Sequence, residues 1–173
     1  MKKTIITMLL CVVSIAAMAG SGLKVVKGDK KFFKTAEGNA SLEFVWDGAT
    51  YDDRMPLTDY YTNLNDLEKA AWQWFRDEFN DHCKKVKVVE TTNDVKYKIT
   101  IKVTKMDMYV KVMSFVPGNA TKAWGTVTIT DAATGEQLMV ADFNKIDGGA
   151  NPTERGSFGD CFKDLAQRLY KCK

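Results

Sequence analysis

The chain has 173 residues, of which 45% are hydrophobic and 27% are charged, which is enough for one domain with its own core. The net charge of +3 includes Lys2 and Lys3, which lie in a segment that we expect to be removed. The rest of the sequence is close to neutral, so its composition does not support binding to nucleic acid or to an anionic membrane surface.

The N-terminus has the pattern of a secretory leader. Its two lysines precede an apolar run over residues 4–15, and Ala17 and Ala19 form a small-x-small cleavage pattern. The run is shorter than the roughly 20 residues that a membrane anchor needs. We expect cleavage after Ala19, a periplasmic or secreted location, and residues 20–173 as one domain. Leu10 before Cys11 fits a lipoprotein cleavage box poorly, so we expect no lipid anchor.

The first part of the mature chain predicts one firm strand. Residues 23–34 hold two short apolar pieces and predict an edge hairpin or an arm. Alternation of apolar and other residues predicts a strand at residues 42–46. Residues 47–63 show no period and predict a long loop, and the aspartates in it fit no calcium-binding pattern.

A helix and a long strand follow. Asn65 and Glu68 match a capped helix start, and an apolar stripe predicts a helix over residues 66–85. Residues 95–103 then alternate without error, which predicts a strand with one buried face that continues toward residue 112. The apolar residues of this run occupy odd positions up to Val103 and even positions from Met106 onward. This change predicts a β-bulge, with two strands joined by a tight turn as the alternative.

The last part of the chain predicts a hairpin and a helix. Strands are expected at residues 124–130 and 137–143, and Ser157 with Asp160 predicts the cap of a helix over residues 158–172. The element order is therefore β-α-β-β-β-α. It predicts an α+β fold, a two-layer sandwich in which two helices cover one face of a mixed, mostly antiparallel sheet.

Two groups of side chains are candidate binding residues. The polar face of the sheet is one, although a lysine ladder is more often a solvated face that opposes aggregation. The aromatic residues of the predicted loop are the other. The candidates are Lys96, Lys98, Lys102, Thr126 and Thr128 on the sheet, and Tyr51, Tyr60 and Tyr61 in the loop.

The sequence offers little for catalysis. His82 is the only histidine, so neither a zinc triad nor a Ser-His-Asp set can form. Glu78 and His82 are an acid–base dyad in one interpretation and a helix-edge pair, joined by Arg168, in the other. Ser157 fits a helix cap better than a nucleophile elbow. We expect no catalytic residue, no metal and no cofactor.

Three cysteines remain after the leader. Cys161 and Cys172 lie on one predicted helix, about 16 Å apart along its axis, which is too far for a disulfide. If the two helices are parallel, their C-terminal ends adjoin. This arrangement predicts a Cys83–Cys172 disulfide with Cys161 as a buried thiol, whereas a Cys83–Cys161 bond would contradict parallel helices.

The exported chain, its element order and the hairpin at residues 131–136 together resemble small modules of bacterial cell-envelope accessory proteins. The N-terminal domain of TolB and the lipoprotein activators of penicillin-binding proteins are examples. The resemblance implies a non-enzymatic module that binds an envelope protein or an acidic partner surface. Two alternatives stay open. One is a small hydrolase or ligand-binding enzyme that uses Glu78, His82 and the glycine loop near Ser157, and the other is a subunit that self-assembles through the sheet face.

Overall fold

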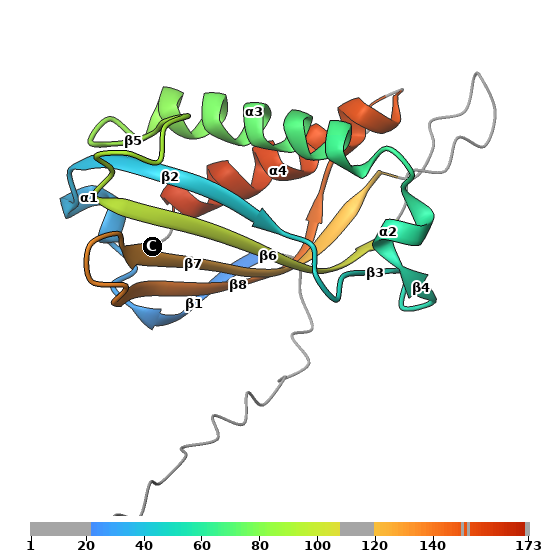
Figure 1. The fold of residues 1–173 in the computed structure, drawn as a ribbon, viewed down its shortest axis with the longest axis horizontal. Coiled ribbons are helices and arrows are strands. Elements are labelled where there is room, and N and C mark those ends of the chain that lie inside the picture. The colour runs from blue at the N-terminus through green and yellow to red at the C-terminus, as the bar shows by residue number, and fades with distance from the viewer. Residues whose placement is uncertain (1–21, 108–119, 150, 152, 172–173) are drawn as a thin grey trace, which may run out of the picture.

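The computed structural model describes residues 22–107, 120–149, 151 and 153–171, and it confirms the predicted α+β class (Figure 1). Eight strands and four helices occur in these residues. In chain order they are β1 (Gly22–Gly28), α1 (Phe32–Thr35), β2 (Gly38–Val45), β3 (Thr50–Tyr51), β4 (Met55–Pro56), α2 (Leu57–Tyr60), α3 (Leu64–His82), β5 (Val86–Val88), β6 (Tyr97–Asp107), β7 (Lys122–Asp131), β8 (Gln137–Asp147) and α4 (Glu154–Lys171).

The strands form one mixed sheet in the order β1-β8-β7-β6-β2-β5. Strand β2 runs parallel to both β5 and β6, whereas β6, β7, β8 and β1 pair antiparallel. The short β3 pairs with the end of β6, beyond the end of β2, and with β4. A long crossover that contains α3 joins β2 to its parallel neighbours, as parallel pairing requires.

The alternation predicted for the central strand is confirmed in β6. Ile99, Ile101 and Val103 are fully buried on one face, and Met106 joins them after a shift in register between Val103 and Lys105. This shift is the predicted bulge, so the tight-turn alternative is wrong. The predicted continuation from residue 108 to residue 112 lies outside the described residues.

Gly125 lies opposite the bulge and permits a close approach of two strands. A Cβ atom at this position would lie 2.1 Å from the Lys102 carbonyl oxygen and 2.6 Å from the Phe143 ring. Only glycine avoids both contacts, which explains why the hydrophobic pattern of β7 is interrupted here.

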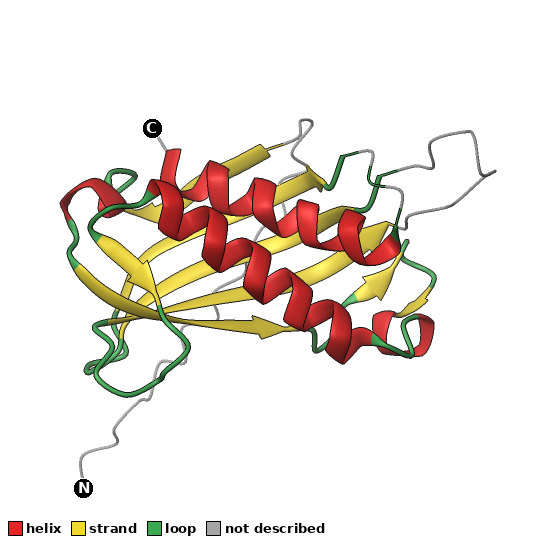
Figure 2. Ribbon diagram, turned by 90° about the horizontal axis from the view of Figure 1, so that it is seen from above, coloured by secondary structure: helices red, strands yellow, loops and turns green. Residues whose placement is uncertain are grey.

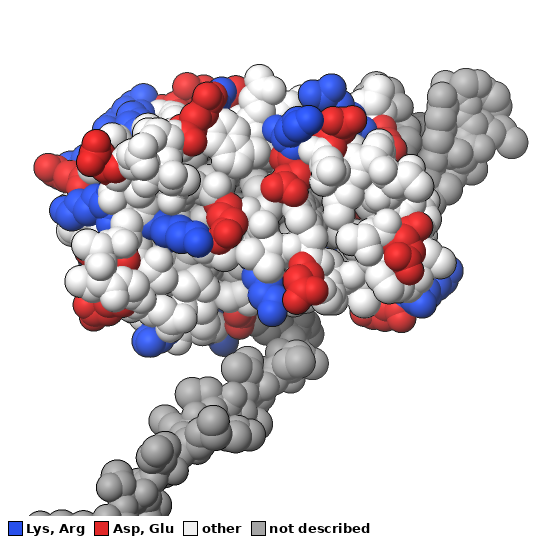
Figure 3. All heavy atoms as spheres, in the orientation of Figure 1, with Lys and Arg blue, Asp and Glu red and all other residues white. Residues whose placement is uncertain are grey.

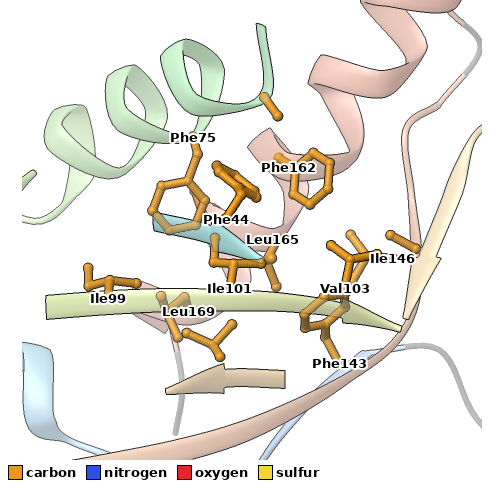
Figure 4. Packing of buried hydrophobic residues seen from close by; sticks show 14 of the residues in the cluster. Phe44, Phe75, Ile99, Ile101, Val103, Phe143, Ile146, Phe162, Leu165 and Leu169 are labelled. Atoms are coloured by element: carbon orange, nitrogen blue, oxygen red, sulfur yellow. The ribbon is translucent and has the colours of Figure 1, made fainter. Parts of the chain in front are cut away.

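Helices α3 and α4 cover one face of the sheet (Figure 2). Phe75 of α3 and Phe162, Leu165 and Leu169 of α4 point toward Ile99, Ile101 and Val103 of β6 (Figure 4). These side chains form one continuous hydrophobic core. Among the described residues, no helix is long and apolar enough to cross a membrane.

The two long helices are parallel, as predicted. Gly159 in the first half of α4 packs against the Trp74 ring near the middle of α3. Near their C-terminal ends, the His82 and Tyr170 rings stack with centroids 4.9 Å apart. The C-terminal ends of α3 and α4 therefore adjoin.

Several predicted boundaries are wrong. Helix α3 begins at Leu64 and ends at His82, and the residue at its N-cap is Asn63, whose side chain makes no capping bond. Residues 23–34 form the edge strand β1 and the short helix α1 rather than a hairpin or an arm. Residues 47–63 contain β3, β4 and α2 rather than one loop. Elements of two to four residues are too short to show a period, so pattern reasoning does not detect them.

Candidate binding surfaces

The face of the sheet opposite the helices carries most of the predicted binding residues. In Figure 1 both long helices lie on the other side of the sheet. We call this surface the outer face. Its side chains form three rows across neighbouring strands: Ser41, Lys98 and Thr130; Glu43, Thr100, Thr128 and Val140; and Val45, Lys102, Thr126 and Asp142.

Acidic side chains partly neutralise the lysines of the outer face. Lys98 Nζ lies 2.7 Å from Glu43 Oε2 on the next strand. The Thr126 hydroxyl donates to Asp142 Oδ1 at 3.3 Å. Lys102 is exposed and has no ion-pair partner within the described ranges. The outer face is therefore a mixed polar surface on which Lys102 is a lysine without an acidic partner among the described residues.

Lys96 lies apart from the rows of the outer face. It precedes β6, and its ammonium donates to the Glu37 carbonyl oxygen at 3.4 Å and lies 5.4 Å from the centre of the Tyr97 ring. Around it is an open hollow of about 480 Å³, lined in addition by Phe32, Thr35, Asp131 and Leu138. Lys96 thus belongs to the end of the sheet where α1 meets the β7–β8 hairpin.

The three predicted tyrosines gather beyond the end of β2. Tyr51 and Tyr60 are half-buried, with ring centroids 4.2 Å apart, and Tyr60 contacts Tyr61. Tyr61 is only 3% exposed and packs edge-on against Phe158 of α4. This burial corrects the prediction of Tyr61 as a contact residue, because its ring belongs to the core. Only Tyr51 and Tyr60 remain accessible for binding.

Three aspartates surround Lys105 where β3 and β4 meet β6. Lys105 pairs with Asp53, lies 3.9 Å from Asp52 and 4.0 Å from Asp107, and its ammonium lies over the Trp124 ring. A hydrogen bond with Asp53 raises the pKa of Lys105. Burial and a hydrogen bond with Asp52 raise the pKa of Asp107. No group of three or more His, Cys, Asp or Glu residues in the described part of the chain is arranged to hold a metal ion.

Glu78 and His82 form a polar cluster between the helices. His82 Nδ1 lies 3.2 Å from Glu78 Oε1, and Gln167 of α4 donates to the same oxygen at 2.7 Å. Lys163 Nζ lies 3.7 Å from Glu78 Oε2. The predicted partner Arg168 instead pairs with Asp164, one turn before it on α4. The cluster joins α3 to α4, in agreement with the helix-edge interpretation.

Ser157 does not cap α4, which corrects the prediction. The helix begins at Glu154, and the Thr153 hydroxyl accepts from the Gly156 N–H at 3.0 Å, as an N-cap residue does. Ser157 is fully buried within the helix, where its hydroxyl accepts from the Thr121 N–H at 2.9 Å. The cap was expected at the wrong residue because Thr153, four residues before Ser157, is also a residue type that caps helices.

The described cysteines are buried. Cys161 is fully buried, as predicted, donates to the Ile146 carbonyl oxygen at 3.2 Å, and has its pKa raised by burial. Cys83 is 4% exposed and forms no disulfide within the described residues. The predicted Cys83–Cys172 bond involves a residue outside the described part, so it stays a prediction.

A second hollow, which the sequence did not predict, lies along α3. It measures about 750 Å³ and is lined by Asn65, Glu68, Lys69, Trp72, Gln73, Arg76 and Glu90. Figure 3 shows this side of the molecule, where basic and acidic side chains are interspersed. Neither hollow is lined by Glu78, His82 or Ser157.

No protein-family model matches this chain, and no curated protein matches its sequence. Several solved structures are similar to it, among them the following three bacterial ones. A PelC dodecamer from Paraburkholderia phytofirmans shares 11% identity with a TM-score of 0.45, covering 83% of this chain and 95% of that one. A Xanthomonas campestris protein of family DUF330 has 11% identity and a TM-score of 0.37, covering 79% of this chain and 81% of that one.

The third structure is a neuraminyllactose-binding hemagglutinin homologue from Helicobacter pylori. It has 9% identity and a TM-score of 0.37, covering 84% of this chain and 87% of that one. Identities and TM-scores of this size establish neither a family nor a function for this chain.

Proposed function

We propose that the chain is a non-enzymatic binding module of the bacterial envelope that holds a partner protein against its outer face. The observation that carries the proposal is the outer face itself, a broad surface of threonine, lysine and valine side chains on strands whose other face is covered by two helices. We further propose that residues 1–19 are a cleaved leader and that residues 20–173 form the single exported domain.

The outer face has the size of a protein interface. Strands β6, β7 and β8 are 11, 10 and 11 residues long, which corresponds to about 35 Å at 3.3 Å per residue. Five strands spaced about 4.8 Å apart add roughly 20 Å of width. The product, on the order of 700 Å², is close to the roughly 800 Å² that each partner contributes to a standard interface.

The charges favour a partner with carboxylates. Lys102 is exposed between Val45 and Thr126 on the neighbouring strands, and Lys24 of β1 lies at the far end of the same row. A carboxylate placed over Lys102 would lose water against threonine and valine side chains, and the hydroxyls would supply hydrogen bonds. Such a charge pair adds specificity and association rate more than affinity.

The geometry supports the hydrolase alternative less well than it supports a binding module. A nucleophile must reach its substrate, but the Ser157 hydroxyl is buried and already accepts a backbone hydrogen bond. Glu78 is bound by Gln167 and Lys163 in a contact between helices. These groups account for one another as packing interactions.

The test uses photo-crosslinking of the mature chain in a native envelope. A crosslinking residue in place of Thr128 should capture one defined protein, and Lys98→Glu with Lys102→Glu should reduce that capture at least about tenfold, because like charges would face an acidic partner. The matched control is Lys30→Glu with Lys84→Glu, which makes the same charge change at exposed lysines away from the outer face.

Equal capture by both double variants would contradict the proposal. Light scattering of the purified chain identifies the self-assembly alternative. If the chain self-assembles, its measured mass is a multiple of the monomer mass. If only Lys98→Glu with Lys102→Glu lowers this mass to that of the monomer, the partner on the outer face is a second copy.

A further inference from the structure

The two edges of β2 are paired to different lengths. On one side β6 pairs with β2 from Ala40 to Val45. On the other side β5 pairs only from Gly38 to Ala40. Within the described ranges, no strand lies beside residues 41–45 on the β5 side. This stretch is an open strand edge, which we call the β2 edge.

Hydrogen bonds at the start of β2 show which backbone groups point to the open side. The Gly38 N–H donates to the Lys85 carbonyl oxygen, and the Ala40 carbonyl oxygen accepts from the Val89 N–H, both at 3.0 Å. The backbone groups of one residue in a strand point to the same side, and this side repeats every second residue. Leu42 and Phe44 therefore direct their N–H and C=O groups to the β2 edge.

One of these four groups already has a side-chain partner. The Trp72 indole N–H donates to the Leu42 carbonyl oxygen at 3.3 Å, so a side chain of α3 reaches across the edge. The Leu42 N–H and both backbone groups of Phe44 have no partner within the described part of the chain. An open row of this kind is a template for pairing with another strand.

The hollow of about 750 Å³ lies beside the β2 edge. The two are joined by Trp72, which lines the hollow and bonds to Leu42, and by Glu68, which lines it and accepts from the Trp46 indole. The part of α3 that lines the hollow, from residue 65 to residue 76, is about 16 Å long at 1.5 Å per residue. Five extended residues, the length of the β2 edge, also span about 16 Å.

We propose that an extended peptide segment of a partner protein binds here by adding a strand to β2, in line with β5. Its side chains alternate between two surroundings. Those on the helix side meet Trp72 and the Leu42 side chain and are apolar. Those on the opposite side meet Ser41 and Glu43 and are polar. The hollow has both signs of charge in Glu68, Lys69, Arg76 and Glu90, so the peptide needs no net charge.

This site does not depend on the outer face, because its main bonds are made by the backbone of β2. An experiment can therefore contradict one of the two proposals without contradicting the other. The variant Lys98→Glu with Lys102→Glu tests the outer face and leaves the Leu42 and Phe44 amides intact. Changes at Leu42 test the β2 edge and leave both lysines intact.

The experiment titrates the mature chain with a capped synthetic peptide of sequence Lys-Thr-Val-Thr-Val-Thr-Lys and follows backbone amides by NMR. Binding at the β2 edge should slow hydrogen exchange of the Leu42 and Phe44 amides at least about tenfold at saturation, since both become bonded. Amides of Lys98 and Thr128, which lie inside the sheet ladder, serve as internal references.

Leu42→Pro and Leu42→Ala form the decisive pair. Both shorten the side chain, but only proline removes the N–H that points to the edge, and it leaves the bonds between β2 and β6 in place. We expect Leu42→Pro to bind the peptide about tenfold more weakly than Leu42→Ala, the effect of one backbone hydrogen bond. Circular dichroism shows whether both variants are folded.

Equal affinities in two folded variants would overturn the proposal. So would protection confined to other strands, or a peptide that fails to bind the unaltered chain. If Leu42→Pro does not fold, peptide-induced protection of the Leu42 and Phe44 amides in Leu42→Ala decides the question. The Leu42 and Phe44 amides could also exchange slowly in the chain without peptide. If this protection disappears on dilution, a second copy of the chain occupies the edge, which also overturns the proposal.

Discussion

Tyr61 illustrates how one buried polar atom makes the stability of the fold depend on pH. Its hydroxyl is buried and has no hydrogen-bond partner in the described residues. Burial is the main cause that raises the pKa of Tyr61 far above its ordinary value, and the nearby Glu154 carboxylate adds to the effect. The folded state therefore keeps this hydroxyl protonated at pH values where the unfolded chain releases the proton. Stability is lost as the pH rises above about 10, the ordinary pKa of tyrosine.

Tyr61→Phe should therefore flatten the alkaline fall in stability. At neutral pH the variant should be as stable as the unaltered chain or more stable by about 1 kcal/mol, because an unpartnered buried hydroxyl is removed. At about pH 11 its advantage should be larger, since phenylalanine has no proton to release. Urea denaturation at both pH values measures this. Tyr170→Phe, at a half-buried ring, is the control, and an equal advantage in both variants would contradict the explanation.

At the scale of elements, the contact between α3 and α4 depends on a buried carboxylate. Glu78 is 8% exposed and is held by Gln167, Lys163 and His82. A buried charge that loses a donor costs more than the same bond contributes when it is intact. The cluster thus fixes how the two parallel helices meet along their length.

A double-mutant cycle tests this coupling. Gln167→Leu should cost about 1–3 kcal/mol because it leaves Glu78 Oε1 without its shortest bond. Gln167→Leu combined with Glu78→Leu should recover much of that loss, because no buried charge remains. Urea denaturation gives the free energies. The more exposed Asp164–Arg168 pair within α4 is the control and should couple by less than about 0.5 kcal/mol. Similar coupling in both pairs would remove the special role of Glu78.

Long elements were predictable because their patterns are long. The alternation in β6, its bulge and the amphipathic stripes of α3 and α4 repeat often enough to be recognised, and together they determine the α+β class. Helix starts were less predictable. Asn65 and Ser157 were expected as caps but lie inside their helices, which begin at Leu64 and Glu154. Thr153 makes the capping bond of α4, whereas the side chain of Asn63 makes none at α3. Caps depend on backbone geometry that a sequence pattern does not contain.

For the whole molecule, a single core predicts a single unfolding transition. Side chains from β2, β6, β7, β8, α3 and α4 belong to one buried cluster. Far-UV circular dichroism and tryptophan fluorescence should therefore give the same urea midpoint for the mature chain. The four tryptophans are suitable probes, because Trp124 lies opposite the β6 bulge and Trp74 lies between the helices. Separate midpoints would show that the chain has more than one folding unit.

The candidate sites were predictable to different degrees. Lys98, Lys102, Thr126 and Thr128 were expected on one face, and they share it because side chains in a strand alternate with a fixed period. The β2 edge could not be predicted, since it depends on the length of β5 and on where the chain leaves the sheet. Tyr61 was misplaced for a similar reason. Its burial against Phe158 joins segments almost one hundred residues apart.

The pairing of β1 with β8 has a consequence for the order in which the chain can fold. Leu23 pairs with Phe143, so the first strand of the described chain has its partner near the end of the sequence. During synthesis or translocation from the N-terminus, β1 must wait until residues 137–147 have emerged. Pairing across so long a loop is slow, because the loss of chain entropy precedes the gain from contacts. Strand β1 is therefore made first but joins the sheet late. Folding is completed only after most of the chain is available.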